Sequence, residues 1–143
     1  MTFRELTAEE KQKLESAPVL ISLLVSGADP EMNEKEKKEA LHFSHIKTFT
    51  ADPLLREFYR DVEKGFEERT AELDRELPKE RKEREEEIKK RLASIEPILE
   101  KLGKTYTILM HQSLNSYYEH VSKAHRTVVE SFLVPIYIKG FSD

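Results

Sequence analysis

Residues 53–77 read PLLREFYRDVEKGFEERTAELDREL. Its apolar side chains recur at steps of three, four and seven residues, which places them on one face of a helix. Asp52 precedes Pro53, an order that caps and starts a helix because proline needs no backbone donor in the first turn. The pattern predicts one helix of 25 residues, about 37 Å long. The apolar positions are Leu55, Phe58, Tyr59, Val62, Phe66, Leu73 and Leu77.

A second helical stretch follows Pro78, which breaks or kinks the first. Residues 79–91 contain twelve charged side chains, with Ile88 as the exception. We expect a helix there because acid and base alternate at the favourable i,i+4 spacing. The pairs are Glu80–Arg84, Glu85–Lys89, Glu86–Lys90 and Glu87–Arg91.

The apolar pattern continues from Ile88 to Leu109 at steps of four and three, the spacing of a helical-bundle seam. Pro97 predicts a kink near 94–97, and Gly103 predicts a break. A last helix then covers about 104–124.

Together these stretches predict an antiparallel hairpin, 53–77 against 79–102, whose tip at 78–87 has almost no apolar side chain to bury. The tip is expected to project into solvent. One interpretation makes it a docking arm for a partner, and the other makes it a solvated end held by salt bridges of little energetic value.

The N-terminal part predicts further helices. Thr7 and Glu10 form a capping box that starts a short helix over 8–16. Ser16 offers a second cap, and Pro18 suits the first turn of a separate helix that runs to Gly27.

Residues 19–25 are apolar except for one serine, so this second helix is expected to be the most buried element. A loop over 27–33 then leads to a helix over about 34–50, for which Asn33 and Glu36 form the capping box.

Composition supports an all-α fold, a compact multi-helix bundle in a single domain over residues 1–143. Charged residues make up 36% and glycine only 4 of the 143 residues. The absence of cysteine excludes disulfides, thiolate zinc sites and a cysteine nucleophile. A net charge of -4 with both signs interspersed predicts no nucleic-acid partner. The first fifteen residues lack a signal-peptide layout and no apolar run spans a membrane, so we expect a cytoplasmic protein.

The C-terminal tail, residues 127–143, is rich in β-branched and aromatic side chains, and Pro135 prevents a continuous helix. We expect an extended tail that covers apolar surface. It packs over the protein's own helices in one interpretation and bridges subunits in the other.

His42 and His45 fall within the apolar arc of their predicted helix, and Glu39 precedes His42 by three residues. This is one half of a di-iron Glu-x-x-His pattern. The two histidines are either metal ligands or, as we favour, hydrogen-bonded side chains at the core edge. No serine-hydrolase or phosphate-loop motif occurs in the sequence.

An acidic loop offers a second metal hypothesis. Oxygens of Asp29, Glu31, Asn33 and Glu36 are the type of ligand that a hard cation such as Ca²⁺ prefers. The same residues also suit helix caps and helix-dipole partners, which would leave any cation weakly bound.

The apolar helix ends in Ala28-Asp29, Met32 follows in the loop, and Glu36 stands seven residues after the aspartate. Over about residues 18–46 this pattern resembles the helical-pair signature of the TerB-like, tellurite-resistance family. Pro30 stands where that family usually has glycine, and the second Ala-Asp-Gly loop of many members is not visible. The resemblance implies an all-helical fold, a divalent-cation loop in some relatives, and a stress-linked or membrane-complex adaptor role.

From these patterns we expect a non-enzymatic cytoplasmic interaction or adaptor module. Its partner is a second protein or another copy of the chain, with the hairpin or the tail as the dimer contact. The alternative is a divalent-metal-binding helical protein that uses loop 29–36 or His42 and His45.

Overall fold

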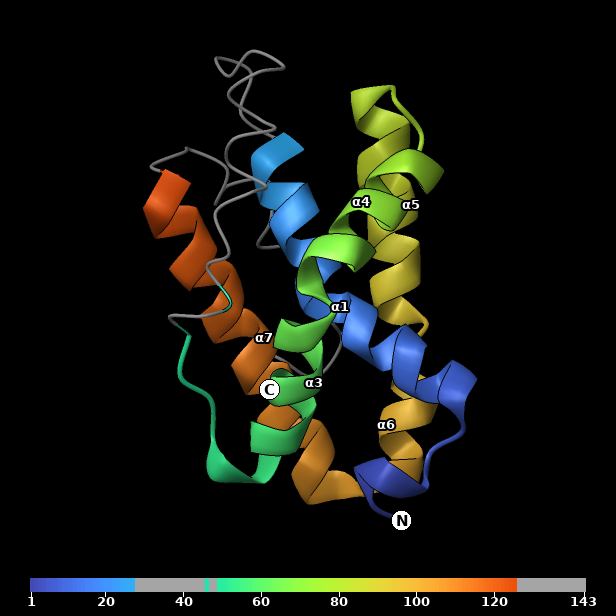
Figure 1. The fold of residues 1–143 in the computed structure, drawn as a ribbon, viewed down its shortest axis with the longest axis vertical. Coiled ribbons are helices and arrows are strands. Elements are labelled where there is room, and N and C mark those ends of the chain that lie inside the picture. Colours follow the sequence, from blue (N-terminus) through green and yellow to red (C-terminus); the bar gives the residue numbers. More distant parts are fainter. Residues whose placement is uncertain (28–45, 47–48, 126–143) are drawn as a thin grey trace.

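The structure is a computed structural model that describes residues 1–27, Ile46 and residues 49–125. Every regular element in this part of the chain is helical, which confirms the predicted all-α bundle. Figure 1 shows α1 in the middle, with α7 on one side and α5 and α6 on the other. The elements are the 3-10 helix η1 (Phe3–Glu5), α1 (Ala8–Gly27), the 3-10 helix η3 (Pro53–Leu55), α3 (Arg56–Lys64), α4 (Phe66–Glu76), α5 (Arg81–Ala93), α6 (Glu96–Leu102) and α7 (Lys104–His125).

Two predicted segments cannot be compared with the structure in full. The tail over 127–143 and most of the predicted helix over 34–50 lie outside the described residues. At the end of that helix, Phe49 and Thr50 are described and are not helical.

Helix α1 is the central element, as the apolar run predicts. Every residue from Ala17 to Ser26 is buried, and α1 contacts α3, α4, α5 and α7. The predicted capping box is confirmed at its start. The Glu10 N–H donates to the Thr7 hydroxyl over 3.1 Å, and the Thr7 N–H donates to the Glu10 carboxylate over 3.0 Å.

The prediction of two helices in this region is wrong, because α1 runs through Pro18 without interruption. Ser16 is not a cap, since its hydroxyl donates to the Lys13 carbonyl within the same helix. A proline inside a helix removes one backbone hydrogen bond. Burial of both halves of α1 offsets that cost, and burial depends on neighbours that a local pattern does not report.

The long helix predicted over 53–77 is divided into η3, α3 and α4. The Asp52 cap is confirmed, because its carboxylate accepts the Leu54 N–H over 2.9 Å. The chain first makes a 3-10 turn, and Gly65 then separates α3 from α4. Glycine is the weakest ordinary helix former, so an interruption costs least there. The apolar periodicity still predicted the buried side, where Leu55, Phe58, Val62, Phe66 and Leu77 lie.

The later helices confirm the predicted interruptions. Helix α5 ends at Ala93, and α6 begins at Glu96 with Pro97 in its first turn. Gly103 ends α6 at a φ of 99°, a conformation that side-chain-bearing residues rarely adopt, and α7 follows directly. Predicted as 104–124, the last helix ends at His125.

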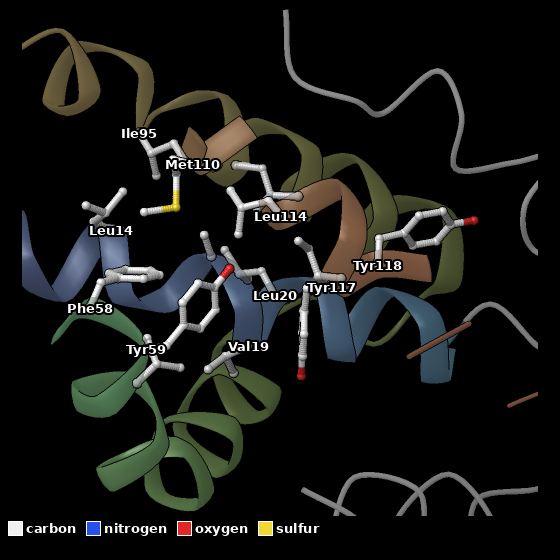
Figure 2. Packing of buried hydrophobic residues seen from close by; sticks show 14 of the residues in the cluster. Leu14, Val19, Leu20, Phe58, Tyr59, Ile95, Met110, Leu114, Tyr117 and Tyr118 are labelled. Atoms are coloured by element: carbon white, nitrogen blue, oxygen red, sulfur yellow. The ribbon is translucent and has the colours of Figure 1, made fainter. Parts of the chain in front are cut away.

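The core lies where α1 meets α3 and α7. Figure 2 shows Leu14, Leu20, Phe58, Met110 and Leu114 converging around α1, and each is fully or almost fully buried.

Candidate functional site

The residues predicted to bind metal cannot be placed. Asp29, Glu31, Asn33 and Glu36, as well as His42 and His45, lie outside the described residues. Within the described part, no group of three or more His, Asp or Glu side chains is arranged to hold a metal ion.

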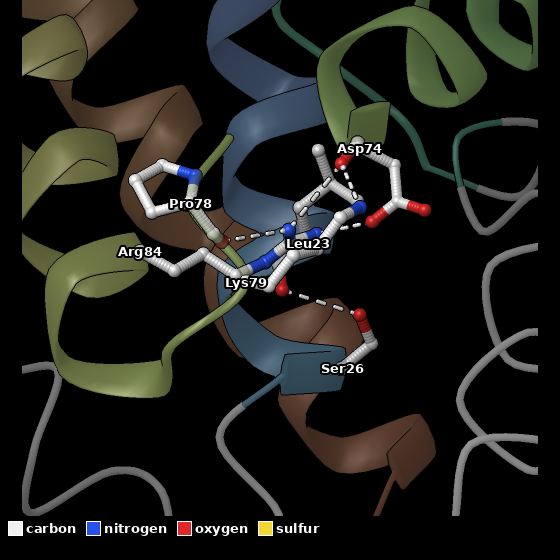
Figure 3. A network of polar contacts seen from close by, with 6 residues as sticks. All are labelled: Leu23, Ser26, Asp74, Pro78, Lys79 and Arg84. Atoms are coloured by element: carbon white, nitrogen blue, oxygen red, sulfur yellow. Dashed lines mark hydrogen bonds and ion pairs between the residues drawn. The ribbon is translucent and has the colours of Figure 1, made fainter. Parts of the chain in front are cut away.

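The turn between α4 and α5 is held by one arginine. The Arg84 guanidinium donates to the main-chain carbonyls of Asp74 and Pro78, over 3.5 and 3.4 Å, and forms an ion pair with the Asp74 carboxylate. Lys79 adds a hydrogen bond to the Asp74 carbonyl over 3.1 Å. Figure 3 shows these contacts beside Leu23 and Ser26 of α1.

The same arginine lies close to the C-terminal end of α1. Its Nε lies 3.9 Å from the position that a Cβ on Gly27 would occupy. The C-terminal end of a helix carries partial negative charge, so a guanidinium is stabilised there. Leu77 and Ile88 are buried on either side of the turn. The two helices and the turn are thus fixed from the inner side.

The outer side of α5 is different. Lys82, Glu83, Glu86, Lys89 and Lys90 are all exposed and fall within one arc of the helix. We call these five residues the α5 outer face. None of the five side chains forms an ion pair with another described residue, although Lys82 with Glu86, and Glu86 with Lys90, have the i,i+4 spacing.

The ion pairs of α5 lie instead on its flanks. Glu87 and Arg91 pair as predicted, over 2.8 Å, and Arg91 also reaches Glu76 of α4 over 3.3 Å. The predicted Glu80–Arg84 pair is replaced. Glu80 caps α5 by accepting the Glu83 N–H over 2.7 Å, and Arg84 turns to Asp74. The i,i+4 rule considers partners only on the same helix, so it misses contacts across the hairpin.

A partly buried ion pair lies on the other side of α4, at a cleft of about 360 Å³ between α1 and α4. Glu15 is 7% exposed and accepts a hydrogen bond from Arg69 over 2.6 Å. Burial raises the pKa of Glu15, and the Arg69 charge opposes that rise. A Cβ on Gly65 would lie 3.3 Å from an Arg69 nitrogen, so the glycine leaves room for the guanidinium.

Two buried tyrosine–serine pairs link α7 to its neighbours. Tyr59 shares a hydrogen bond of 2.7 Å with Ser113, and Tyr117 shares one of 2.7 Å with Ser22. Burial raises the pKa of Tyr117 to about 12 and also raises the pKa of Tyr59. Neither phenol ionises near neutral pH, so neither can act as a base toward its serine. These pairs fix the packing of α1, α3 and α7.

One histidine connects α6 to α7. His111 Nε2 lies 2.9 Å from both carboxylate oxygens of Glu96. A carboxylate only accepts hydrogen bonds, so this ring nitrogen carries the proton. The contact spans the break at Gly103 and supports the angle between the two helices.

Comparison with known proteins supplies no relative. No family model, no curated protein and no solved structure matches the chain. None of the helices in the described residues is long and apolar enough to span a bilayer.

Proposed function

We propose that this protein is a non-enzymatic helical interaction module that binds a protein partner through the α5 outer face. The observation that carries the proposal is the contrast between the two sides of the hairpin. Leu77, Ile88 and the Arg84 contacts fix its inner side, whereas the outer face presents five charges that form no ion pair within the described part of the chain.

Such a surface suits recognition by charge. An ordered helix already holds the backbone positions of its charges, so binding does not cost the conformational entropy of ordering this segment. Apolar recognition has less support in the described residues, where the large exposed hydrophobic side chains are Met1, Leu54 and Ile108, on separate elements. The three lysines of the outer face favour a partner with an acidic surface.

The test compares two triple variants of equal charge change. Lys82→Glu/Lys89→Glu/Lys90→Glu alters the outer face, and Lys13→Glu/Lys64→Glu/Lys104→Glu alters exposed lysines on α1, α3 and α7. Each protein is crosslinked in cells, and the crosslinked proteins are identified by quantitative mass spectrometry. Circular dichroism checks that both variants remain folded.

We expect one or more proteins to crosslink to the wild type and to the control variant, and to be lost from the hairpin variant. A partner retained equally by both variants would contradict the proposal. Light scattering of the purified chain tests self-association, and a dimer that the outer-face variant converts to a monomer would make a second copy the partner.

The adaptor role in stress responses, which the TerB-like resemblance implies, stays a prediction. The same holds for the cytoplasmic location. The metal-binding alternative rests on residues outside the described part of the chain.

A further inference from the structure

A second cleft, of about 300 Å³, lies beside helix α3. One wall is the side of α3 that carries Arg56, Tyr59, Arg60 and Glu63. The other wall is formed by the chain before η3. It consists of Ile46, Phe49, Thr50 and Ala51, and is mostly apolar. We call this hollow the α3 cleft.

The aromatic rings in the cleft are held in place. Phe49 packs against the Tyr59 ring at 5.3 Å and against the Tyr117 ring at 5.2 Å, both between centroids. The Tyr59 hydroxyl is bonded to Ser113 in the core, so it is not available to a ligand. The apolar wall is therefore ordered without any ligand.

The arginines of the cleft stand out by their lack of partners. Most arginines in the described part of the chain form ion pairs with carboxylates, whereas Arg56 and Arg60 form none. Both are exposed, and Arg75 of α4 is the third arginine of this kind. The paired arginines are Arg4, Arg69, Arg81, Arg84 and Arg91.

The placement of the two charges also has a cost. Arg56 and Arg60 are four residues apart on α3, and like charges at this spacing repel each other. Glu63 is the one acidic side chain among the described lining residues, and it pairs with neither arginine. An anionic group bound between the guanidinium groups would relieve the repulsion and accept their hydrogen bonds.

The two walls together specify the ligand. An extended peptide alternates its side chains between two sides, at about 3.3 Å per residue. Carboxylates on alternate residues are therefore about 6.6 Å apart, close to the 5–6 Å that separates side chains four residues apart on a helix. A chain lying along the cleft can direct these carboxylates to α3 and the intervening apolar side chains to Phe49 and Ala51, which are partly exposed.

We propose that the α3 cleft binds an extended segment of a protein partner in which acidic and apolar residues alternate. This inference rests on the proposed function, because it gives the interaction module a second contact with a defined peptide chemistry. The open shape of the cleft suits a peptide on a protein surface better than an enclosed small molecule.

The experiment measures binding of a fluorescein-labelled hexapeptide of alternating Glu and Leu by fluorescence polarisation. Four forms of the full chain are compared: wild type, Arg56→Gln/Arg60→Gln, the control Lys13→Gln/Arg75→Gln, and the outer-face triple variant. A peptide of alternating Gln and Leu serves as the uncharged control probe.

We expect the wild type and the Lys13/Arg75 control to bind the acidic probe equally. The Arg56/Arg60 variant should bind it at least about tenfold more weakly, because charge-assisted hydrogen bonds are lost. The outer-face variant should bind the acidic probe like the wild type. The experiment therefore tests the α3 cleft independently of the proposed contact through the α5 outer face.

Four results would overturn the inference. The first is a wild type that leaves the acidic probe unbound, and the second is an Arg56/Arg60 variant that binds it as tightly as the wild type does. Equal binding of the Gln-Leu peptide would show that the cleft recognises apolar side chains and not carboxylates. If inorganic phosphate displaces the labelled probe at the same concentration as the unlabelled acidic peptide does, the cleft is a site for small anions and not for a peptide.

Discussion

Two buried tyrosines differ in the surroundings of their hydroxyl groups. The Tyr59 hydroxyl is bonded to Ser113, whereas the Tyr106 hydroxyl is buried without a hydrogen-bond partner among the described residues. Side-chain hydroxyls in a core therefore do not all stabilise it. In the sequence both residues stand at apolar positions of a helix face. The pattern does not distinguish them, because the Tyr59 hydroxyl finds its partner on another helix and the Tyr106 hydroxyl has none among the described residues.

This difference leads to a prediction at the residue scale. Tyr59→Phe should lower the free energy of unfolding by about 1–2 kcal/mol, because the Ser113 hydroxyl is left unpaired in the core. Tyr106→Phe should change it by less than about 0.5 kcal/mol or raise it, since no hydrogen bond is lost. Urea denaturation of the two variants gives the comparison. Equal losses would show that the Tyr59–Ser113 bond adds nothing.

A second residue-scale prediction concerns the acidic loop, outside the described residues. Asn33→Ala should lower the free energy of unfolding by about 1 kcal/mol, the usual cost of a lost helix cap. The loss should be the same with and without a chelator, and Ca²⁺ should not move the unfolding midpoint. A stabilisation by Ca²⁺ that disappears in Asp29→Ala and Glu36→Ala would support the metal-binding alternative, which metal analysis of untagged protein tests directly.

At the scale of elements, the α4–α5 hairpin shows how a charged segment becomes ordered. Its inner positions are occupied by Leu77 and Ile88, and its turn is closed by Arg84. The charges of the hairpin thus have unequal roles. Those on the inner side and flanks connect helices, while those on the α5 outer face form no ion pair with another described residue.

The prediction for this element compares Arg84, which holds the turn, with Arg75, which lies in the last turn of α4. Arg84→Lys should lower the free energy of unfolding by about 1–2 kcal/mol, because an ammonium group does not reproduce the guanidinium contacts with Asp74 and Pro78. Arg75→Lys is the control, exposed and without an ion pair, and should stay within about 0.5 kcal/mol of the wild type. Similar losses in both variants would mean that the Arg84 contacts do not stabilise the turn.

At the scale of the whole molecule, the Glu15–Arg69 pair joins α1 to α4 and links folding to pH. Because burial raises the pKa of Glu15 in the folded state, the folded protein holds this proton more tightly than the unfolded chain does. Unfolding then releases a proton between the usual and the raised pKa. The contribution of Glu15 to the free energy of unfolding therefore falls as pH rises through that window.

Glu15→Gln should remove this dependence, since an amide does not titrate. We expect the stability of the wild type relative to Glu15→Gln to decrease as the pH rises through the range above the usual pKa of a glutamate, about 4.3. Arg69→Gln should steepen the decrease, because it removes the charge that opposes the rise in pKa. Urea denaturation across this range measures all three proteins. A relative stability that increases with pH would show that the ion pair outweighs the cost of burial.

Local sequence patterns predicted the helical class, the start of α1 at Thr7 and Glu10, the cap at Asp52 and the interruption at Gly103. It also predicted the central place of the apolar run in α1. These features depend on groups within one helical turn, or on how apolar side chains repeat along one helix, so the local pattern contains the information.

Three features depend on tertiary packing instead: α1 continues through Pro18, Gly65 divides the helix predicted over 53–77, and Arg84 pairs with Asp74. Arg69 likewise reaches Glu15, which is 54 residues away in the chain. Each of these outcomes depends on a neighbour brought close by packing. Burial on several sides can offset the cost of a local defect, and a charged side chain pairs with the partner that lies nearest in space rather than along its own helix.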